Sequence, residues 1–204
     1  DDAGEFYRVK PPTTVFLTIS CGKGVTSFML GLRAHMLDSL SKQGRPTVDQ
    51  RVQIKRKLAT ILAADVVGYS RLMGEDEEGT ANTLGICRGV FDRLVGTHDG
   101  RIFNTAGDSI VAEFSSPVEA VRCAEKIQAE VLERNSELTP ERRMEFRIGV
   151  HLGDVLVDGD NLLGDGINVA ARLESLAAPG GIALSAAVHQ HVEGKLAGKF
   201  RFEG

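Results

Sequence analysis

An apolar, strand-like run that ends in an aspartate constrains this chain more than any other feature. Residues 58–64 (Leu-Ala-Thr-Ile-Leu-Ala-Ala) lead directly into Asp65, and this run predicts a buried strand that continues to about Val67. A second aspartate, Asp108, follows Gly107 between two further strand-like runs, where a Gly-Asp pair indicates a hairpin turn. If the strands are neighbours in one sheet, the two carboxylates meet at its rim.

Two carboxylates at a sheet rim, beside a loop of small residues, are suited to a divalent cation that carries a nucleoside triphosphate. Carboxylate oxygens are hard ligands of the kind that Mg²⁺ and Mn²⁺ take. The loop after the first aspartate reads Val66-Val67-Gly68-Tyr69-Ser70. Its glycine lets the backbone approach a ligand, and we expect the amides of residues 67–70 to cradle phosphate oxygens near a helix start. Taken alone, Asp65 could be a turn former and Asp108 a hairpin residue; the pair together favours the metal site.

Composition limits the class of protein. The 204 residues suit one domain of about 150 residues with an appendage. A net charge of −4 argues against a general nucleic-acid-binding surface. No secretory signal is visible, and the stretch 13–32 is too interrupted by glycine and lysine to predict a membrane span. The cysteines Cys21, Cys87 and Cys123 have neither metal-ligand nor redox spacing, which favours a reducing cytoplasm.

The chain divides near residue 50. Residues 1–50 have weak periodicity, with apolar positions over 28–40 that could line a helix, and we assign them as an N-terminal extension of unknown role. The basic run 51–57 is interpreted as a solvated linker face, and residues 51–204 as the folded domain. Because the first residue is Asp1 rather than Met, we expect a fragment or a processed chain.

The pattern becomes regular from residue 58 onward. We expect strands at about 58–67, 101–103, 109–114, 145–151, 154–158 and 182–184. We expect helices at about 77–96, from Ser116 to about 132, at 167–177 and at 185–192. The order strand–helix–strand–strand–helix–strand predicts an α+β fold, a ferredoxin-like (split βαβ) sheet with helices on one face. His189 and His191 are interpreted as surface residues of the last helix.

A third motif lies in the helix expected at 167–177. Asn168 and Arg172 are four residues apart and project from one helical face. The surrounding alanines and valines suggest a close-packed face, where a buried arginine needs a carboxylate, a phosphate or several carbonyls. An internal ion pair with Glu174 is an alternative that the sequence leaves open.

Together these motifs resemble those of the class III nucleotidyl cyclases, the adenylate and guanylate cyclases. The resemblance is carried by residues 64–70, Gly107-Asp108 and 168–174, in the family's order and at its approximate spacings, and it covers about 55–204. It implies an intracellular signalling enzyme, a phosphorus–oxygen lyase that forms a 3′,5′-cyclic monophosphate and pyrophosphate. It also implies a ferredoxin-like domain that assembles into head-to-tail homodimers with composite active sites.

The resemblance also implies roles for individual residues. Asp65 and Asp108 would hold two divalent metal ions, Mg²⁺ or Mn²⁺, with help from the Val66 carbonyl. Asn168 would position the ribose and Arg172 would contact the reacting phosphate, both from the opposite protomer. The family continues past the equivalent of the last residue here into another strand, so we expect the C-terminal strand to be truncated.

Two positions that select the base in the family are occupied by amides. They are Asn104, four residues before the second metal aspartate, and Asn161, seven before the helix asparagine; an alignment shifted by one residue would place Asp160 at the second position. Each amide offers a donor and an acceptor, so the pair could read adenine, guanine or a pyrimidine. ATP is favoured because adenylate cyclase activity is common in the family. The alternatives are a cyclase for GTP or a pyrimidine nucleotide, a catalytically retired nucleotide-binding regulatory module, and a dimerisation scaffold.

Overall fold

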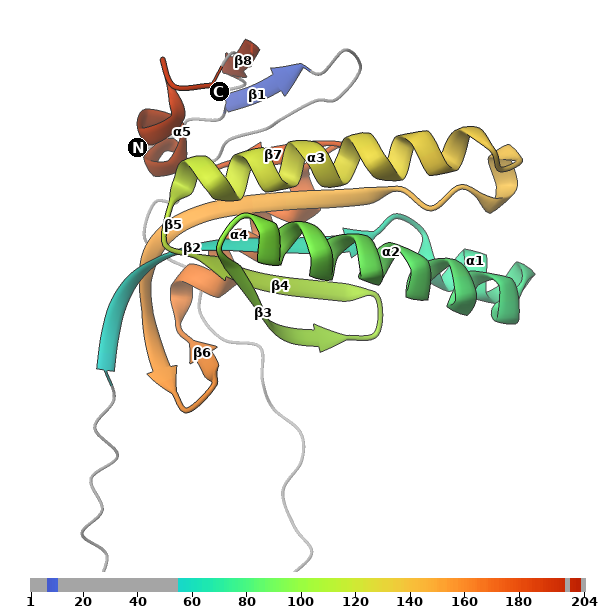
Figure 1. Ribbon diagram of the computed structural model, residues 1–204, viewed down its shortest axis with the longest axis horizontal. Helices are drawn as coiled ribbons and strands as arrows, with labels where there is room; N and C mark the ends of the chain where they lie inside the picture. The colour runs from blue at the N-terminus through green and yellow to red at the C-terminus, as the bar shows by residue number, and fades with distance from the viewer. Residues whose placement is uncertain (1–6, 11–54, 197–198, 203–204) are drawn as a thin grey trace, which may run out of the picture.

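The computed structural model describes residues 7–10, 55–196 and 199–202 (Figure 1). The helical pattern expected over residues 28–40 lies outside this part of the chain, as does Cys21. The strands are β1 (Tyr7–Lys10), β2 (Lys55–Val66), β3 (Gly100–Ala106), β4 (Ser109–Phe114), β5 (Phe146–Asp158), β6 (Asn161–Leu163), β7 (Ile182–Leu184) and β8 (Lys199–Phe202). The helices are α1 (Tyr69–Glu75), α2 (Glu77–Thr97), α3 (Pro117–Ser136), the 3₁₀ turn η1 (Pro140–Arg142), α4 (Asp165–Leu176) and α5 (Ala186–Val192).

One eight-stranded sheet has the order β3-β4-β2-β5-β7-β1-β8, with β6 paired to β5. Its centre is the antiparallel pair of β2 and β5, which runs from Lys55 opposite Val157 to Val66 opposite Phe146. The two strands curve together along their length (Figure 1). All neighbours pair antiparallel except β5 and β7, which are parallel.

The central strand β2 is buried on both faces from Ala59 to Ala64, which explains the apolar sequence of that part, whereas its first four residues are exposed. Leu62, Ala64 and Val66 point into the larger core, together with side chains of α2, α3 and α5. Alternate residues such as Ile61 point into a smaller core on the other face. In the larger core the rings of Phe91 and Phe146 pack with centroids 5.0 Å apart.

Helix α4 covers the face opposite to α2 and α3. Its Ala170 packs in the smaller core with Ile61 and Val155. The helix can lie this close because β5 has a glycine beneath it: a Cβ on Gly149 would be 2.2 Å from the Ala170 carbonyl oxygen. The predicted α+β class is therefore confirmed, and helices cover both faces of the sheet rather than one.

Several element boundaries differ from the predicted ones. The strands expected at 145–151 and 154–158 are one strand, because the residues between them keep pairing with β2. Strand β2 begins at Lys55, so the end of the basic run belongs to the sheet and not to a linker. Helix α1, of seven residues, and strand β6, of three, were not predicted, since elements this short leave little periodicity.

Strand β1 falls within the first fifty residues and pairs antiparallel with β7 and β8. The division of the chain near residue 50 stays a prediction. Cys87 and Cys123 are buried free thiols. His189 is buried, not exposed, whereas His191 is exposed. Among the described helices, none combines the length and the apolar character needed to cross a lipid bilayer.

Candidate active site

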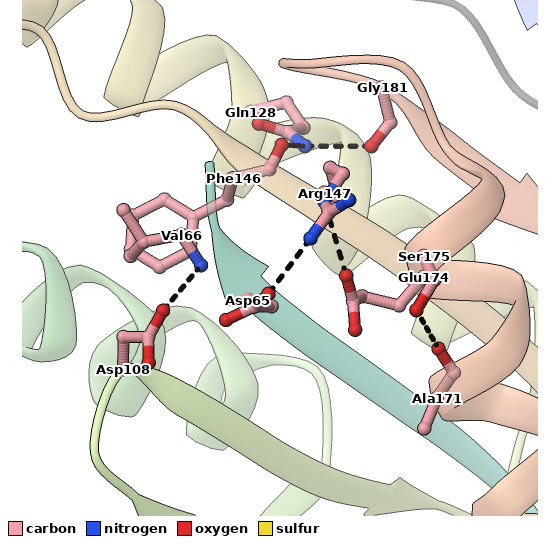
Figure 2. Close-up of polar contacts among 10 residues, drawn as sticks. All are labelled: Asp65, Val66, Asp108, Gln128, Phe146, Arg147, Ala171, Glu174, Ser175 and Gly181. Carbon is pink, nitrogen blue, oxygen red and sulfur yellow. Dashed lines mark hydrogen bonds and ion pairs between the residues drawn. The ribbon is translucent and has the colours of Figure 1, made fainter. Parts of the chain in front are cut away.

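The end of β2 and the turn between β3 and β4 bring Asp65, Val66 and Asp108 together (Figure 2). The turn has two residues, and Gly107 adopts the left-handed φ of 60° that such a turn requires. Because β4 pairs with β2, the turn lies beside the end of β2. The Val66 amide donates to Asp108 Oδ2 at 3.3 Å. The two carboxylates thus meet at one rim of the sheet.

The electrostatics of this rim favour a cation. Burial, followed by the neighbouring Asp65 carboxyl, raises the pKa of Asp108 from 3.8 to about 6. The ionised form of Asp108, which burial and the neighbouring Asp65 carboxyl disfavour, is stabilised when a positive charge lies between the two side chains. No group of three or more His, Cys, Asp or Glu side chains in the described ranges is arranged to hold a metal. Two carboxylates and a backbone carbonyl still fit Mg²⁺ or Mn²⁺, since such ions complete their shells with water and substrate phosphates.

A guanidinium lies on the other side of Asp65. Arg147 stands opposite Asp65 in the β2–β5 register, and its Nη2 donates to Asp65 Oδ2 at 2.9 Å (Figure 2). Its Nε lies 3.3 Å from Glu174 Oε1, on the sheet-facing side of α4. Burial, with smaller contributions from Asp65 and Asp108, raises the pKa of Glu174 to about 7, although Arg147 acts to lower it.

Sequence reasoning missed Arg147 and considered Glu174 only as a partner for Arg172. The structure pairs Glu174 with Arg147 instead. One signal was available: Arg147 interrupts an apolar strand between Phe146 and Ile148, and a charge in such a strand needs a partner. Its partner lies 82 positions away in the sequence, which no local pattern indicates.

The loop predicted to cradle phosphates turns sharply into α1. Gly68 has a φ of 67°, which favours glycine, and it precedes the first helical residue. The Val67 amide already donates to the Glu145 carbonyl at 2.8 Å. The amides of Tyr69 and Ser70, in the first turn of α1, have no acceptor within the helix.

Asn168 and Arg172 are exposed on the outer face of α4. The expectation of a close-packed face around Arg172 is therefore wrong for this chain. The reason is the helical period: α4 buries Gly166, Ala170 and Glu174 against the sheet, so residues two positions away point outward.

Asn104 and Asn161 are exposed on β3 and β6. Strand β3 shifts its register with β4 between Ile102 and Asn104. Strand β3 is bridged to the turn that precedes β6, because Arg101 Nη1 donates to the Asp160 carbonyl at 2.8 Å. The bridge joins segments that are 59 positions apart in the sequence.

Comparison with known proteins agrees with this architecture. The model of the adenylate and guanylate cyclase catalytic domain family matches residues 52–204. A Rhizobium meliloti (strain 1021) protein named "Putative adenylate cyclase 3" is 49% identical over 144 residues, which are 70% of this chain and 24% of that protein. The rat guanylate cyclase soluble subunit beta-2 is 29% identical over 194 residues, 88% of this chain and 28% of the subunit. The chain therefore spans less than a third of the length of these two relatives.

Solved structures of cyclase domains share the fold. The crystal structure of an adenylate/guanylate cyclase/hydrolase from Silicibacter pomeroyi superposes with a TM-score of 0.67 at 36% identity, covering 71% of this chain and 84% of that one. The guanylyl cyclase Cya2 superposes with a TM-score of 0.61 at 23% identity over 68% of this chain and 79% of its own, a likeness of fold alone. The chain belongs to the adenylate and guanylate cyclase catalytic domain family, the class III nucleotidyl cyclases.

Proposed function

We propose that the domain is an enzyme that converts ATP to 3′,5′-cyclic AMP and pyrophosphate in intracellular signalling. The observation that carries this proposal is the meeting of Asp65 and Asp108 at one rim of a cyclase-family fold. A pair of half-buried carboxylates with a raised pKa at Asp108 is costly for folding, and it becomes useful when a cation binds there.

In this proposal Asp65, Asp108 and the Val66 carbonyl would hold two divalent ions, Mg²⁺ or Mn²⁺. When bound, the ions would make the ribose 3′-hydroxyl a better nucleophile and neutralise the triphosphate. The 3′-oxygen forms a bond to the α-phosphorus, its proton passes to solvent, and the bond to the departing pyrophosphate breaks. Asn168 orients the ribose, and Arg172 donates to the α-phosphate oxygens as negative charge grows on them.

A second copy of the chain would complete the site. Asn168 and Arg172 lie on the exposed outer face of α4, while the inner face of this helix meets Arg147 through Glu174. Residues on opposite faces of one helix are well placed to serve two different sites. We therefore propose a symmetric head-to-tail homodimer with two composite sites, each with its metal ligands from one chain and Asn168 and Arg172 from the other.

The base would be read by Asn104 and Asn161, and Arg101 bridges β3 to the turn that precedes Asn161. We favour ATP because the relative with 49% identity is named as an adenylate cyclase. GTP is the first alternative, since the rat relative is named as a guanylate cyclase subunit. A cytoplasmic location suits the buried free thiols of Cys87 and Cys123.

A catalytically retired nucleotide-binding module is the alternative of a different class. It is favoured by the two uncharged amides at Asn104 and Asn161, because uncharged pairs discriminate less strongly than charge-assisted ones. A retired site would bind a nucleotide without releasing pyrophosphate.

Product identification by mass spectrometry tests the proposal. The protein is incubated separately with ATP, GTP, CTP and UTP, in Mg²⁺ and in Mn²⁺, beside Asp108→Ala. We expect cyclic AMP from ATP, and no product from the variant. A cyclic product from another nucleotide, and none from ATP, would show that the other nucleotide is the substrate. Nucleotide binding without any cyclic product would favour the retired module.

A further inference from the structure

Arg147 lies between two acidic groups that come from different elements. Its Nη2 donates to Asp65 Oδ2 at 2.9 Å, and its Nε is 3.3 Å from Glu174 Oε1 (Figure 2). The exposed fractions of the side chains of Asp65, Arg147 and Glu174 are 24%, 28% and 10%. This set of three residues, the Arg147 bridge, is thus more enclosed than an ordinary surface ion pair, in which solvent weakens the attraction.

The Arg147 bridge limits the movement of Asp65. A free carboxylate rotates about its terminal torsion with little resistance. A charge-assisted hydrogen bond from a guanidinium fixes the position of one oxygen and therefore the plane of the group. The guanidinium is itself fixed, because Arg147 is held in register opposite Asp65 and its other edge faces Glu174.

Glu174 also offsets the positive charge that Arg147 brings to the site. An arginine beside a metal-binding carboxylate adds a positive charge that would repel an incoming cation. In its ionised form, Glu174 offsets that charge and leaves Asp65 and Asp108 to supply the negative field. The guanidinium can then orient Asp65 without lowering the attraction of the site for a cation.

We propose that Arg147 and Glu174 are positioning residues of the metal site, in which Arg147 orients Asp65 and Glu174 holds and neutralises Arg147. This inference rests on the metal-binding role proposed above for Asp65 and Asp108. The inner face of α4 would then contribute to the metal site of its own chain. The outer face, as proposed above, would contribute to the site of the partner chain.

Direct Mn²⁺ binding tests the inference without using turnover. Electron paramagnetic resonance measures free Mn²⁺ in the presence of the full chain and α,β-methylene-ATP, which cannot release pyrophosphate by the normal cleavage. We expect Arg147→Met to raise the Mn²⁺ dissociation constant about tenfold or more, a typical effect of removing a partner that orients a ligand. Arg147→Lys should recover part of the affinity, because one ammonium can keep the contact with Asp65 but lacks the two-sided fork.

A double-mutant cycle separates positioning from simple charge removal. If Glu174 acts through Arg147, Glu174→Gln weakens Mn²⁺ binding in the wild-type chain and has little further effect in Arg147→Met. An equal effect in both backgrounds would overturn the role assigned to Glu174. Arg134→Met, which removes an exposed ion pair with Glu130 on α3, is the matched control and should bind Mn²⁺ like the wild type.

Unchanged or tighter Mn²⁺ binding by a folded Arg147→Met would overturn the inference, since Arg147 would then only compete with the metal. If Arg147→Met does not fold, Arg147→Lys and Glu174→Gln decide in the same assay. A wild-type chain that binds Mn²⁺ but forms no cyclic nucleotide would reject the proposed reaction. The positioning role of Arg147 and Glu174 at the metal site would be unaffected. A wild-type chain that binds no Mn²⁺ would reject both.

Discussion

The two faces of α4 differ in how the protein holds their functional side chains. On the inner face, Glu174 is buried and meets Arg147, which in turn binds Asp65. On the outer face, Asn168 and Arg172 are exposed. The metal-binding half of the proposed site is thus assembled within one chain by long-range contacts. The other half lies on the exposed face of one helix, so we expect it to be altered with less effect on the fold.

Arg172→Ala should show the largest difference between the two faces of α4, because it should affect turnover but not stability. We expect turnover to fall about a hundredfold, the usual cost of losing one donor to developing charge. Because the side chain is exposed, we expect the melting temperature and Mn²⁺ binding to stay at their wild-type values. Cyclic-nucleotide assays, thermal melts and Mn²⁺ titrations on the same preparation check this.

Mixing Arg172→Ala with Asp65→Ala chains sharpens this comparison. In a random mixture about half of the dimers contain one chain of each kind, and each of these has one intact composite site, so about a quarter of the wild-type activity should return. The variants assayed separately are the controls. No recovery from folded, dimeric chains would contradict the assignment of the two faces to different sites.

Gly149→Ala should disturb the packing of α4 against β5, the strand that contains Gly149. The added Cβ would lie 2.2 Å from the Ala170 carbonyl oxygen and 2.3 Å from the Glu174 amide nitrogen, both of which belong to the backbone. We expect a loss of about 1–3 kcal/mol in the free energy of unfolding, the usual cost of overpacking. Urea denaturation measures it.

Gly89→Ala is the matched control for that substitution. Gly89 is an exposed residue of α2, and a Cβ there would meet no atom within 4 Å. Since alanine is a better helix former, we expect a gain of about 0.5–1 kcal/mol in the free energy of unfolding. A Gly149→Ala protein as stable as the wild type would mean that α4 can shift away from the sheet.

The smallest expected effect is a pH-dependent gain in stability from Asp108→Asn, measured in EDTA. The folded protein raises the pKa of Asp108 from 3.8 to about 6, so the protonated form is favoured by folding. This contribution to stability is fully present below about pH 4 and is lost as the pH rises through 6. An asparagine stays neutral, so the variant should melt a few degrees above the wild type at pH 7.

That difference should nearly disappear at about pH 3, below the unfolded value of 3.8, where Asp108 is mostly protonated in both the folded and the unfolded chain. Thermal melts of the two proteins across this pH range provide the test. An equal difference at both pH values would show that the carboxyl group does not oppose folding through its charge.

The parts of the fold that were predicted carry local signals. The hairpin at Asp108 was predicted from a two-residue turn, and Gly107 has the expected positive φ. The start of α3 was predicted from Ser116, whose hydroxyl accepts the Glu119 amide at 3.4 Å. Both signals lie within a few residues, where propensity and side-chain capping act directly.

The parts that were missed depend on contacts between distant segments. Arg147 meets Asp65 only because β2 and β5 pair in one register, and a shift by one residue would turn Arg147 to the other face. The outward direction of Arg172 depends on which side of α4 packs on Gly149. Sequence periodicity identified the helix but did not determine which of its small residues faced the sheet.

The exposed outer face of α4 has a consequence for how this domain tolerates mutation. Since Asn168 and Arg172 contribute little buried surface, almost any polar residue there should leave the amount of folded protein in a cell unchanged. Gly149 should tolerate almost nothing, because any side chain would overlap the backbone of α4. In a scan that scores abundance and signalling separately, Gly149 would be constrained in both scores, whereas Asn168 and Arg172 would be constrained only in signalling.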